Sequence, residues 1–371
     1  MSRLKFIEVN FHCHTDLDNP ETVIEKHRQP NLYTRELKKE ADIILVKHLH
    51  YDGERAVEGI RYRFFERSNR FWNLPGPTLR FIAGEKPDVV LVRGFIFPLQ
   101  VMALRRKLGP TPVILLQHQA DHPFRRKKII QQLADRAVNG YLFSAMDLAA
   151  PWLAAGIIRD QSKCFVCPPA STLFEKKDKT ESRKITGMGE GRQFLWVGRL
   201  NANKDPFTVL AAFEKYFEGR TGENLFMIYQ ESDMLESVQN KIRQHPLLSK
   251  QVLLIGKKEH SELEAWYNSA DYFISASHYE SFGFAPMEAI ACGSVPIMSN
   301  TPASIQLVQQ GKSGYIFEKG NSEDLYRVLC SLETTEHSKY SVAGQQFFRE
   351  LLSPTAIASR LLQITGTLQS K

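Results

Sequence analysis

The sequence predicts an α/β fold of two doubly wound domains that face each other across a central cleft. Short apolar runs alternate with amphipathic stretches along the chain, which is the pattern of parallel sheets covered by helices. The 371 residues are too many for one compact core and suit two domains of ordinary size. A charged stretch rich in Ser, Thr and Gly, residues 175–191, interrupts the alternation and indicates a linker.

The apolar runs give the predicted strands in chain order. In the N-terminal half they are residues 4–11, 42–46, 88–92, 112–117, 140–144 and a buried run from Cys164 that ends at Pro168-Pro169. In the C-terminal half they are residues 193–197, 224–229, 251–255, 271–277, 295–298 and 314–317. A helix is predicted from Pro206, in its first turn, to Gly219 just past its end, and another begins after Ser353.

These elements predict an N-terminal domain at residues 1–170, a linker at 171–192, a C-terminal domain at 193–352 and a C-terminal helix at 353–371. That helix is amphipathic, and its apolar face is expected to belong to the core rather than to a membrane anchor. No apolar run approaches the roughly 20 residues of a membrane-spanning helix, and the start lacks the apolar segment of a signal peptide. Five scattered cysteines argue against a disulfide scaffold, so we expect a cytoplasmic protein.

The net charge of +7 belongs to the N-terminal half. Residues 1–170 hold 26 Lys and Arg against 18 Asp and Glu, whereas the rest of the chain holds 22 against 23. The densest runs are Arg105–Lys107 and Arg125–Lys128. They are either solvated surface or a face for an anionic membrane or an acidic acceptor, which would make the protein peripheral on the inner face of the membrane. Aromatic residues are not interleaved with them, so no nucleic-acid partner is expected.

The loop after the strand at 193–197 has the features of an anion site. Gly198 permits a sharp exit from the strand, and Asp205 with its following proline is typical of a helix N-terminus. Arg199 and Lys204 lie between them, beyond the carboxyl end of a parallel strand, where ligands bind. Each cation attracts a phosphate by about 4 kcal/mol at 4 Å in an effective dielectric near 20, before desolvation. The alternative is two solvated surface cations.

A second loop of this kind follows the strand at 271–277 and reads "HYESFGFAPMEAIACG". Gly283 lets the backbone approach a ligand closely, and amides near Phe284 and Ala285 are placed to donate to an oxyanion. Pro286 is predicted at the first position of the helix that follows. The loop therefore has the features of a second phosphate-binding element.

Two carboxylates bracket this turn. Glu288 falls near the third helical position, where a carboxylate interacts favourably with the helix dipole by roughly 0.3–1 kcal/mol. Glu280 has no such explanation, and its charge repels a phosphate unless it binds something neutral, such as sugar hydroxyls. Two hydrogen-bond acceptors that flank an anion site suit a nucleotide sugar, which has hydroxyl groups at both ends of a diphosphate.

Glu280, seven intervening residues and Glu288, after a "GR…K" loop, resemble the retaining GT-B glycosyltransferases of family 4. The resemblance runs from about Phe194 to Leu325. It implies two Rossmann-like domains, a nucleotide-sugar donor with UDP favoured, and a saccharide or lipid-linked acceptor on the N-terminal domain. It also implies that the C-terminal helix packs back on that domain. Because two cations and a helix terminus cover the diphosphate, no metal cofactor is expected.

The resemblance also assigns roles to residues. Arg199 and Lys204 neutralise the donor diphosphate, which takes the acceptor proton as it leaves. Glu280 contacts the hydroxyls of the donor sugar, and Glu288 binds the nucleotide ribose. The other donor-site residues are Gly198, Phe282, Gly283 and Phe284, the base-pocket candidates Gly256 and Lys257, and His118, which matches a residue lining the donor-sugar site. Without the resemblance, a His at a strand end is more often structural.

Other interpretations stay open. His12, His14, Asp16 and Asp18 resemble the opening of metal-dependent phosphoesterases, although no further ligand set is recognisable. The chain is alternatively a binding protein that holds a nucleotide sugar without transferring it. A nucleotide-sugar epimerase of similar fold is a further alternative, but the acidic and basic catalytic residues of such enzymes are not recognisable in this sequence. The pair Cys164–Cys167 suggests a redox or zinc half-site, but a buried strand is the simpler interpretation.

Overall fold

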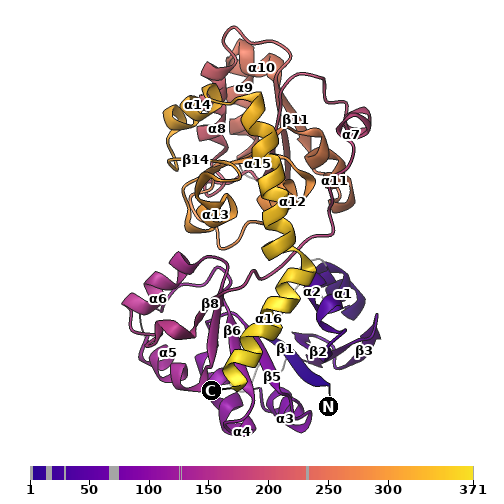
Figure 1. Ribbon diagram of the computed structural model, residues 1–371, viewed down its shortest axis with the longest axis vertical. Helices are drawn as coiled ribbons and strands as arrows, with labels where there is room; N and C mark the ends of the chain where they lie inside the picture. The colour runs from indigo at the N-terminus through magenta and orange to yellow at the C-terminus, as the bar shows by residue number, and fades with distance from the viewer. Residues whose placement is uncertain are drawn as a thin grey trace. The chain divides into compact units, whose positions relative to one another are not determined.

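The structure is a computed structural model that describes residues 3–13, 19–28, 31–66, 75–124, 126, 128–230 and 234–370. The chain forms two compact units. The first contains Met1–Thr172 and Leu351–Lys371, and the second contains Leu173–Glu350. Each unit has a sheet with helices on both of its faces, so the predicted α/β class is confirmed (Figure 1).

The sheet of the first unit is built from parallel strands with one antiparallel edge. Its strands are β1 (Leu4–Cys13), β2 (Ala41–Leu49), β3 (Gly53–Val57), β4 (Ile60–Glu66), β5 (Val89–Arg93), β6 (Val113–Gln117), β7 (Gly140–Phe143) and β8 (Cys164–Val166). Their order within the described residues is β3-β4-β2-β1-β5-β6-β7-β8. All the strands predicted for this half are present.

The hairpin of β3 and β4 was not predicted from the sequence. β4 begins with alternating apolar and charged residues, whereas β3 has two adjacent charged residues and is the exposed edge of the sheet. Glu58 and Gly59 form the turn with positive φ angles of 53° and 76°. A two-residue hairpin turn needs that conformation, but Glu seldom adopts it, so the sequence carries no usual turn signal here.

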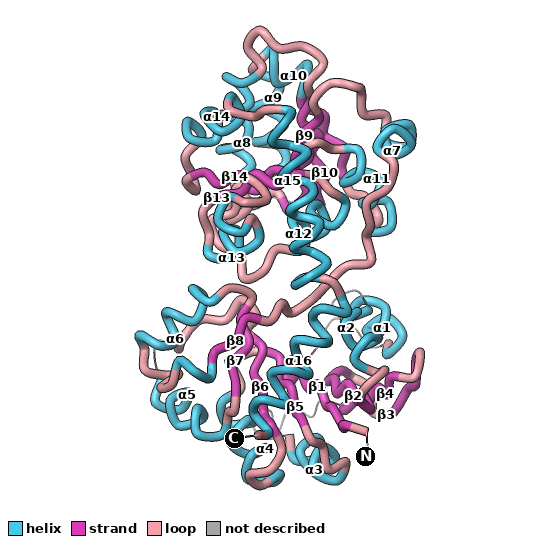
Figure 2. The backbone as a smooth tube through the Cα atoms, viewed as in Figure 1, coloured by secondary structure: helices cyan, strands magenta, loops and turns pink. Residues whose placement is uncertain are grey.

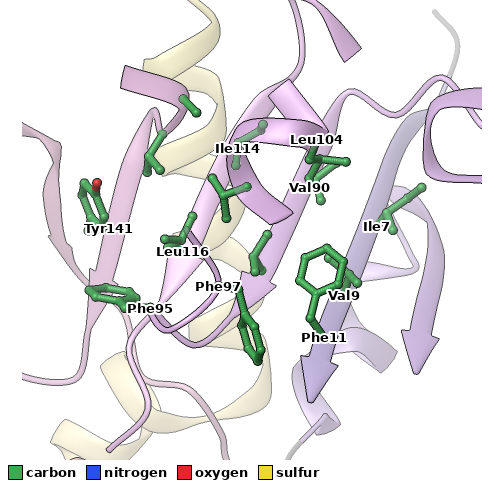
Figure 3. Close-up of a cluster of buried hydrophobic side chains, with 14 of the residues drawn as sticks. Ile7, Val9, Phe11, Val90, Phe95, Phe97, Leu104, Ile114, Leu116 and Tyr141 are labelled. Atoms are coloured by element: carbon green, nitrogen blue, oxygen red, sulfur yellow. The ribbon is translucent and has the colours of Figure 1, made fainter. Parts of the chain in front are cut away.

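Helices bury both faces of this sheet. They are α1 (Pro20–Arg28), α2 (Leu32–Leu37), α3 (Gly76–Gly84), α4 (Pro98–Leu108), α5 (Lys128–Ala134), α6 (Ala150–Ala154) and α16 (Pro354–Gln369). Side chains alternate along β1: Ile7, Val9 and Phe11 belong to a core that includes Leu104 of α4 (Figure 3). Phe6 belongs to the other core, with α1, α2 and α16. The strand ends are therefore the parts of the sheet left to build a site.

The C-terminal helix α16 packs on the first unit. Ser353 caps it by accepting a hydrogen bond from Ala356 N at 3.2 Å. Ile357 and Leu361 are buried in the core that contains β1. Arg360 Nε donates a hydrogen bond to the main-chain oxygen of Val166 in β8 at 3.3 Å. The apolar face of this helix is therefore core, as the sequence predicts.

The second unit has a sheet of parallel strands. They are β9 (Gln193–Arg199), β10 (Asn224–Gln230), β11 (Val252–Gly256), β12 (Tyr272–Ser275), β13 (Val295–Ser299) and β14 (Tyr315–Phe317). Within the described residues their order is β11-β10-β9-β12-β13-β14. Each corresponds to a predicted apolar run.

Two hydrophobic cores cover the faces of this second sheet. The helices of the unit are α7 (Lys179–Thr186), α8 (Pro206–Tyr216), α9 (Leu235–Gln244), α10 (Pro246–Gln251), α11 (His260–Ser269), α12 (Phe284–Cys292), α13 (Pro302–Leu307), α14 (Ser322–Cys330) and α15 (Thr334–Phe347). α8, α9 and α14 contribute to one core, and α11 and α12 contribute to the other (Figure 2). The fold thus places the starts of α8 and α12 at the carboxyl ends of β9 and β12.

The segment predicted as a linker, residues 171–192, contains helix α7. Asp178 caps this helix by accepting a hydrogen bond from Glu181 N at 2.9 Å. Arg183 NH2 binds Asp271 at 2.8 Å, so the helix is held partly by an ion pair. Its high charge is the reason that it resembles a linker in the sequence. No helix in the described part of the chain is long and apolar enough to cross a bilayer.

Candidate functional site

The two loops predicted to bind phosphate start side by side at one edge of the second sheet. β9 and β12 are neighbouring parallel strands, so their carboxyl ends are adjacent. In the loop after β9, Asp205 Oδ1 accepts a hydrogen bond from Thr208 N at 3.1 Å, and Pro206 is the first residue of α8. The predicted helix cap is confirmed, and it fixes the far end of this loop.

Hydrogen bonds join these two loops directly. Asn203 Oδ1 accepts from Tyr279 N at 3.0 Å, and Asn203 Nδ2 donates to Tyr279 O at 3.1 Å. Asn203 O accepts from His278 N at 2.8 Å, and His278 Nε2 lies 3.1 Å from Asp205 Oδ2. Because these contacts are mostly main-chain or amide bonds, the side chains of one loop keep a fixed position relative to those of the other.

Lys204 and Glu280 form an ion pair across the two loops. Ser277 Oγ also donates a hydrogen bond to Glu280 Oε1 at 2.9 Å. The side chains of Lys204 and Glu280 are 28% and 13% exposed, so the pair is less screened than a surface pair but still reachable by a ligand. The structure therefore brings together the predicted cation and the predicted sugar-binding carboxylate.

Arg199 is the second predicted cation of this site. It ends β9 and is exposed, and within the described residues its side chain has no ion pair or hydrogen bond. A Cβ on the preceding Gly198 would lie 3.2 Å from the Trp196 ring and 3.6 Å from Lys204 Cγ. The glycine thus leaves room for the Trp196 ring, and an added Cβ would be in ordinary contact with the Lys204 stem. With one cation paired and one unpaired, the loop carries a positive charge that an anion can neutralise.

Helix α12 begins two residues earlier than predicted. Gly283, with a φ of 89°, precedes the helix, so Pro286 is its third residue and not its first. Proline is tolerated there because the first amides of a helix have no intrahelical acceptor. For the same reason the amides of Phe284 and Ala285 are available to an oxyanion. A Cβ on Gly283 would lie 2.8 Å from Pro286 Cγ, so the turn requires glycine.

Glu288 consequently lies in the second turn of α12, and the predicted position near the helix start is wrong. Its side chain is 7% exposed, and Oε1 lies 2.7 Å from His260 Nε2. His260 is the first residue of α11, and its ring stacks on Phe174 at a centroid distance of 4.8 Å. The hydrogen bond to Glu288 raises the pKa of His260. A hydrogen bond from His260, rather than the start of the helix, therefore satisfies this buried carboxylate.

The remaining predicted residues of the second unit differ in exposure. Phe282 is buried and Phe284 is 45% exposed, with their rings edge to face at 5.9 Å. Gly256 ends β11 with a φ of 81°. Lys257 is exposed, with its Nζ 3.9 Å from Glu259 Oε1. β10 separates β11 from β9, so these last two residues start from a strand that is not adjacent to the joined loops.

His118 of the first unit is buried directly after β6. Its Nε2 lies 3.0 Å from Asp121 O, and its ring packs edge to face on Phe95 and Trp152. Burial lowers the pKa of His118, which favours a neutral ring. Its buried Nδ1 has no hydrogen-bond partner among the described residues. His118 is thus packed among aromatic rings with one ring nitrogen unsatisfied. Its role at the donor-sugar site stays a prediction.

The metal-site interpretation falls mostly outside the described residues. His14, Asp16 and Asp18 lie outside them, and His12 is an exposed residue whose main-chain N donates to Asn10 Oδ1 at 2.9 Å. Within the described ranges, no group of three His, Cys, Asp or Glu is placed to hold a metal ion.

The two cysteines at β8 are buried and free. Burial raises the pKa of Cys164 to about 11 and that of Cys167 to about 12. Protonated, buried thiols are poor nucleophiles and poor metal ligands. The buried-strand interpretation of this segment is therefore confirmed.

In the basic run Arg105–Lys107, Arg105 has a structural role. Arg105 NH1 donates to Gly109 O at 2.9 Å and to Pro112 O at 2.9 Å, and its Nε donates to Ala137 O at 3.1 Å. Arg105 therefore closes the loop after α4, which requires a planar, multidentate cation. Arg106 and Lys107 belong to the last turn of the same helix.

Three polar residues that organise the site are not predicted from the sequence. Asn203 joins the loops, Ser277 supports Glu280, and His260 binds Glu288. Asn203 and Ser277 lie within four residues of predicted site residues, and that proximity is the one signal they carry. His260 lies 28 residues before its partner, so only the fold brings the pair together.

Comparison with known proteins gives a family match for the second unit and similar sequences among curated proteins. Residues 178–346 match the family model described as glycosyl transferases group 1. Among curated proteins, the chain is 25% identical over 239 residues to a GDP-mannose:cellobiosyl-diphosphopolyprenol alpha-mannosyltransferase of Xanthomonas oryzae pv. oryzae. That match covers 64% of this chain and 62% of the relative.

Solved structures show the same fold over nearly the whole chain. Sucrose-phosphate synthase from Thermosynechococcus elongatus superposes with a TM-score of 0.72 at 16% identity, covering 99% of this chain and 100% of that one. Anabaena HepE, solved in complex with UDP and glucose, gives a TM-score of 0.72 at 13% identity, covering 98% and 100%. The second unit therefore matches the glycosyl transferases group 1 family, and the chain as a whole has the GT-B fold of these solved structures.

Proposed function

We propose that the protein is a retaining glycosyltransferase of family 4 that moves a sugar from a nucleotide-diphosphate sugar to a hydroxyl of a saccharide or lipid-linked acceptor. The observation that supports this most is the fixed pair of loops after β9 and β12. They hold the cation of Lys204 against the carboxylate of Glu280, beside an exposed Arg199 and the free amides at the start of α12.

The proposed chemistry follows from those charges. Arg199, Lys204 and the amides of α12 stabilise the negative charge that develops on the leaving diphosphate. The acceptor hydroxyl attacks the anomeric carbon from the face that the diphosphate leaves, and the diphosphate takes the proton. Glu280 orients the sugar through its hydroxyls. Because protein cations and amides perform the charge neutralisation, the proposed reaction needs no divalent metal.

The donor base is a separate part of the proposal. The resemblance to family 4 favours UDP, whereas the name of the Xanthomonas relative favours GDP-mannose. Main-chain contacts often select the base, so no side chain of the site decides between the two. Both donors therefore belong in the test.

The test is the release of nucleoside diphosphate from UDP-glucose and GDP-mannose, with product configuration read by NMR. Transfer with retention, slowed by about tenfold to a hundredfold in Glu280→Gln but unchanged in Glu323→Gln, is the expected result. Glu323 is a matched control because it pairs with Lys215 on the surface of the same unit. Binding without turnover or hydrolysis would identify a nucleotide-sugar-binding protein instead, and inversion of configuration would contradict the retaining mechanism.

We also propose that the first unit docks on an anionic membrane surface. Ile129 and Leu133, which lie one turn apart on α5, are 65% and 45% exposed. Ile96 and Leu99 are exposed at the start of α4, which packs on α5, and Lys128 is exposed at the start of α5. Apolar side chains beside cations suit a lipid headgroup region.

Vesicles of phosphatidylglycerol test this docking. The double substitution Lys128→Glu with Ile129→Asp is expected to abolish sedimentation with the vesicles. Unchanged sedimentation would contradict the membrane part of the proposal and leave the transferase part standing. Of the basic run named from the sequence, Arg125 and Lys127 lie outside the described residues, so the variant uses neither.

A further inference from the structure

The side chain of Glu288 is almost fully buried, yet it has one cationic partner that reaches solvent. His260 Nε2 lies 2.7 Å from Glu288 Oε1, and the two side chains are 42% and 7% exposed. We infer that His260 is a positioning residue that holds the Glu288 carboxylate in the orientation that accepts hydrogen bonds from ribose hydroxyls. The inference rests on the proposed function, together with the ribose-binding role that the resemblance to family 4 implies for Glu288.

Burial makes a partner for Glu288 necessary. An ionised carboxylate in the second turn of a buried helix is costly unless it is paired and hydrogen-bonded. A distance of 2.7 Å between nitrogen and oxygen is typical of a charge-assisted hydrogen bond. The bond occupies Oε1, and a carboxylate has a second oxygen with its own lone pairs. We assign that second oxygen, Oε2, to the ribose hydroxyls.

The ring of His260 is itself held in place. It stacks on Phe174 at 4.8 Å with an interplanar angle of 24°. The segment that carries Phe174 is fixed to α11, because Asn268 Oδ1 accepts from Lys177 N at 2.6 Å and Asn268 Nδ2 donates to Glu175 O at 2.9 Å. The imidazole therefore cannot turn away from Glu288 without breaking a packed contact, which is what a positioning residue requires.

The charges around this pair predict how recognition depends on pH. Glu288 is the charged group that faces His260, and the bond to it raises the pKa of His260. The hydroxyl of Tyr267 of α11 is within hydrogen-bonding reach of Glu288, and Cys292 of α12 lies near it. Burial raises the pKa of both groups, so they stay neutral. Below its raised pKa, His260 is an imidazolium that donates a charge-assisted hydrogen bond to Glu288. As the pH rises through that pKa, the charge is lost and ribose recognition weakens.

The test compares the affinity of the intact protein for UDP and GDP with its affinity for their 2′,3′-dideoxy analogues. The wild type is expected to prefer the ribose form by about tenfold to a hundredfold, the range for hydrogen bonds to a charged acceptor. His260→Ala should reduce that preference to about twofold while the affinity for the dideoxy form is kept. His260→Gln, which retains a neutral donor, should recover part of the preference without its pH dependence.

His245→Gln is the matched control, since His245 Nε2 lies 3.4 Å from Glu214 Oε1 in the same unit. It should leave the ribose preference unchanged. If His260→Ala weakened the binding of ribose and dideoxy forms equally, the positioning role would be overturned and the proposed function would stand. If the folded wild type bound neither UDP nor GDP, the proposed function would fail, and the inference with it.

Discussion

The ammonium of Lys204 and the carboxylate of Glu280 form an ion pair that joins the loop after β9 to the loop after β12. A donor diphosphate carries more negative charge than Glu280, so it competes for Lys204. Under the proposed function, the hydroxyls of the donor sugar then replace Lys204 at Glu280, where Ser277 already donates a bond at 2.9 Å. In this account, donor binding exchanges one internal ion pair for two contacts with the same ligand.

The exchange predicts different effects for binding and turnover. Glu280→Gln keeps an acceptor for sugar hydroxyls but removes the charge, so donor affinity should change by less than about fivefold. Transfer should fall by about tenfold to a hundredfold, since a charged acceptor contributes roughly 1.5–3 kcal/mol when the sugar is oriented for reaction. Steady-state rates and calorimetry on the same preparation measure both. Equal loss of both quantities would indicate a folding defect instead.

The turn before α12 predicts a cost for any side chain at Gly283. Gly283→Ala places a Cβ at a φ of 89° and 2.8 Å from Pro286 Cγ. The free energy of unfolding should fall by about 1–3 kcal/mol, the range for a strained backbone position. Donor affinity should fall as well, because the amides of the first helical turn move.

Gly366→Ala is the control for this change, because Gly366 lies inside α16 and no other atom lies within 4 Å of its added Cβ. That substitution should raise stability by roughly 0.5–1 kcal/mol. Urea unfolding measures both variants. Equal stability of Gly283→Ala and the wild type would show that the turn does not require glycine.

A buried ionic cluster in the first unit predicts loss of stability in acid. Glu8 Oε1 lies 3.2 Å from Lys47 Nζ, Glu8 Oε2 lies 3.3 Å from Arg93 Nε, and Tyr33 donates to the same carboxylate. Burial raises the pKa of Glu8, but Arg93 and Lys47 outweigh it and lower that pKa to about 2. The ionised Glu8 therefore contributes to the free energy of unfolding above pH 4.5, the ordinary pKa of a Glu, and this contribution is lost as the pH falls toward 2. Its size is about 3 kcal/mol.

Urea unfolding from pH 7 to pH 3 measures this contribution. Glu8→Gln should destabilise the protein by about 3–5 kcal/mol at pH 7, because two buried cations lose their partner. It should also remove part of the acid dependence. Glu54→Gln, at an exposed ion pair with Arg61, is the control and should do neither. An acid profile of Glu8→Gln that parallels the wild type would contradict the assignment.

The charge of the site predicts that transfer does not depend on a divalent metal. Activity should survive EDTA, and added Mg²⁺ should change the rate by less than about twofold, since Arg199, Lys204 and helix amides neutralise the diphosphate. A rate assay with and without the chelator decides this. Activity lost to EDTA and restored by Mg²⁺ would show that the cations are insufficient.

The strands of both sheets were predictable because buried parallel strands are continuous apolar runs. The exposed hairpin of β3 and β4 could not be predicted. Its charged residues interrupt the apolar pattern of a strand, and its turn uses Glu58 at a positive φ. Helix α7 was hidden for a similar reason: its sequence is mostly charged, and Arg183 holds it through Asp271.

The candidate site was predictable where its chemistry is local in sequence. Local sequence patterns after the strand ends predict the cation Lys204, the helix cap Asp205 and the carboxylate Glu280. The fold then brings Lys204 and Glu280 together. The start of α12 was misplaced because Pro286 is accepted at several positions of a first turn. The partner of Glu288 could not be predicted, because His260 reaches it through packing of α11 on α12.

The central claim is that Lys204 binds the diphosphate of a nucleotide sugar. Calorimetric titration of the wild type, Lys204→Ala and Lys215→Ala with UDP-, GDP- and ADP-sugars tests it directly. We predict micromolar binding of one donor class, weakened about tenfold to a hundredfold in Lys204→Ala and unchanged in Lys215→Ala, whose lysine forms an exposed pair. A folded wild-type protein that binds none of these donors would contradict the account.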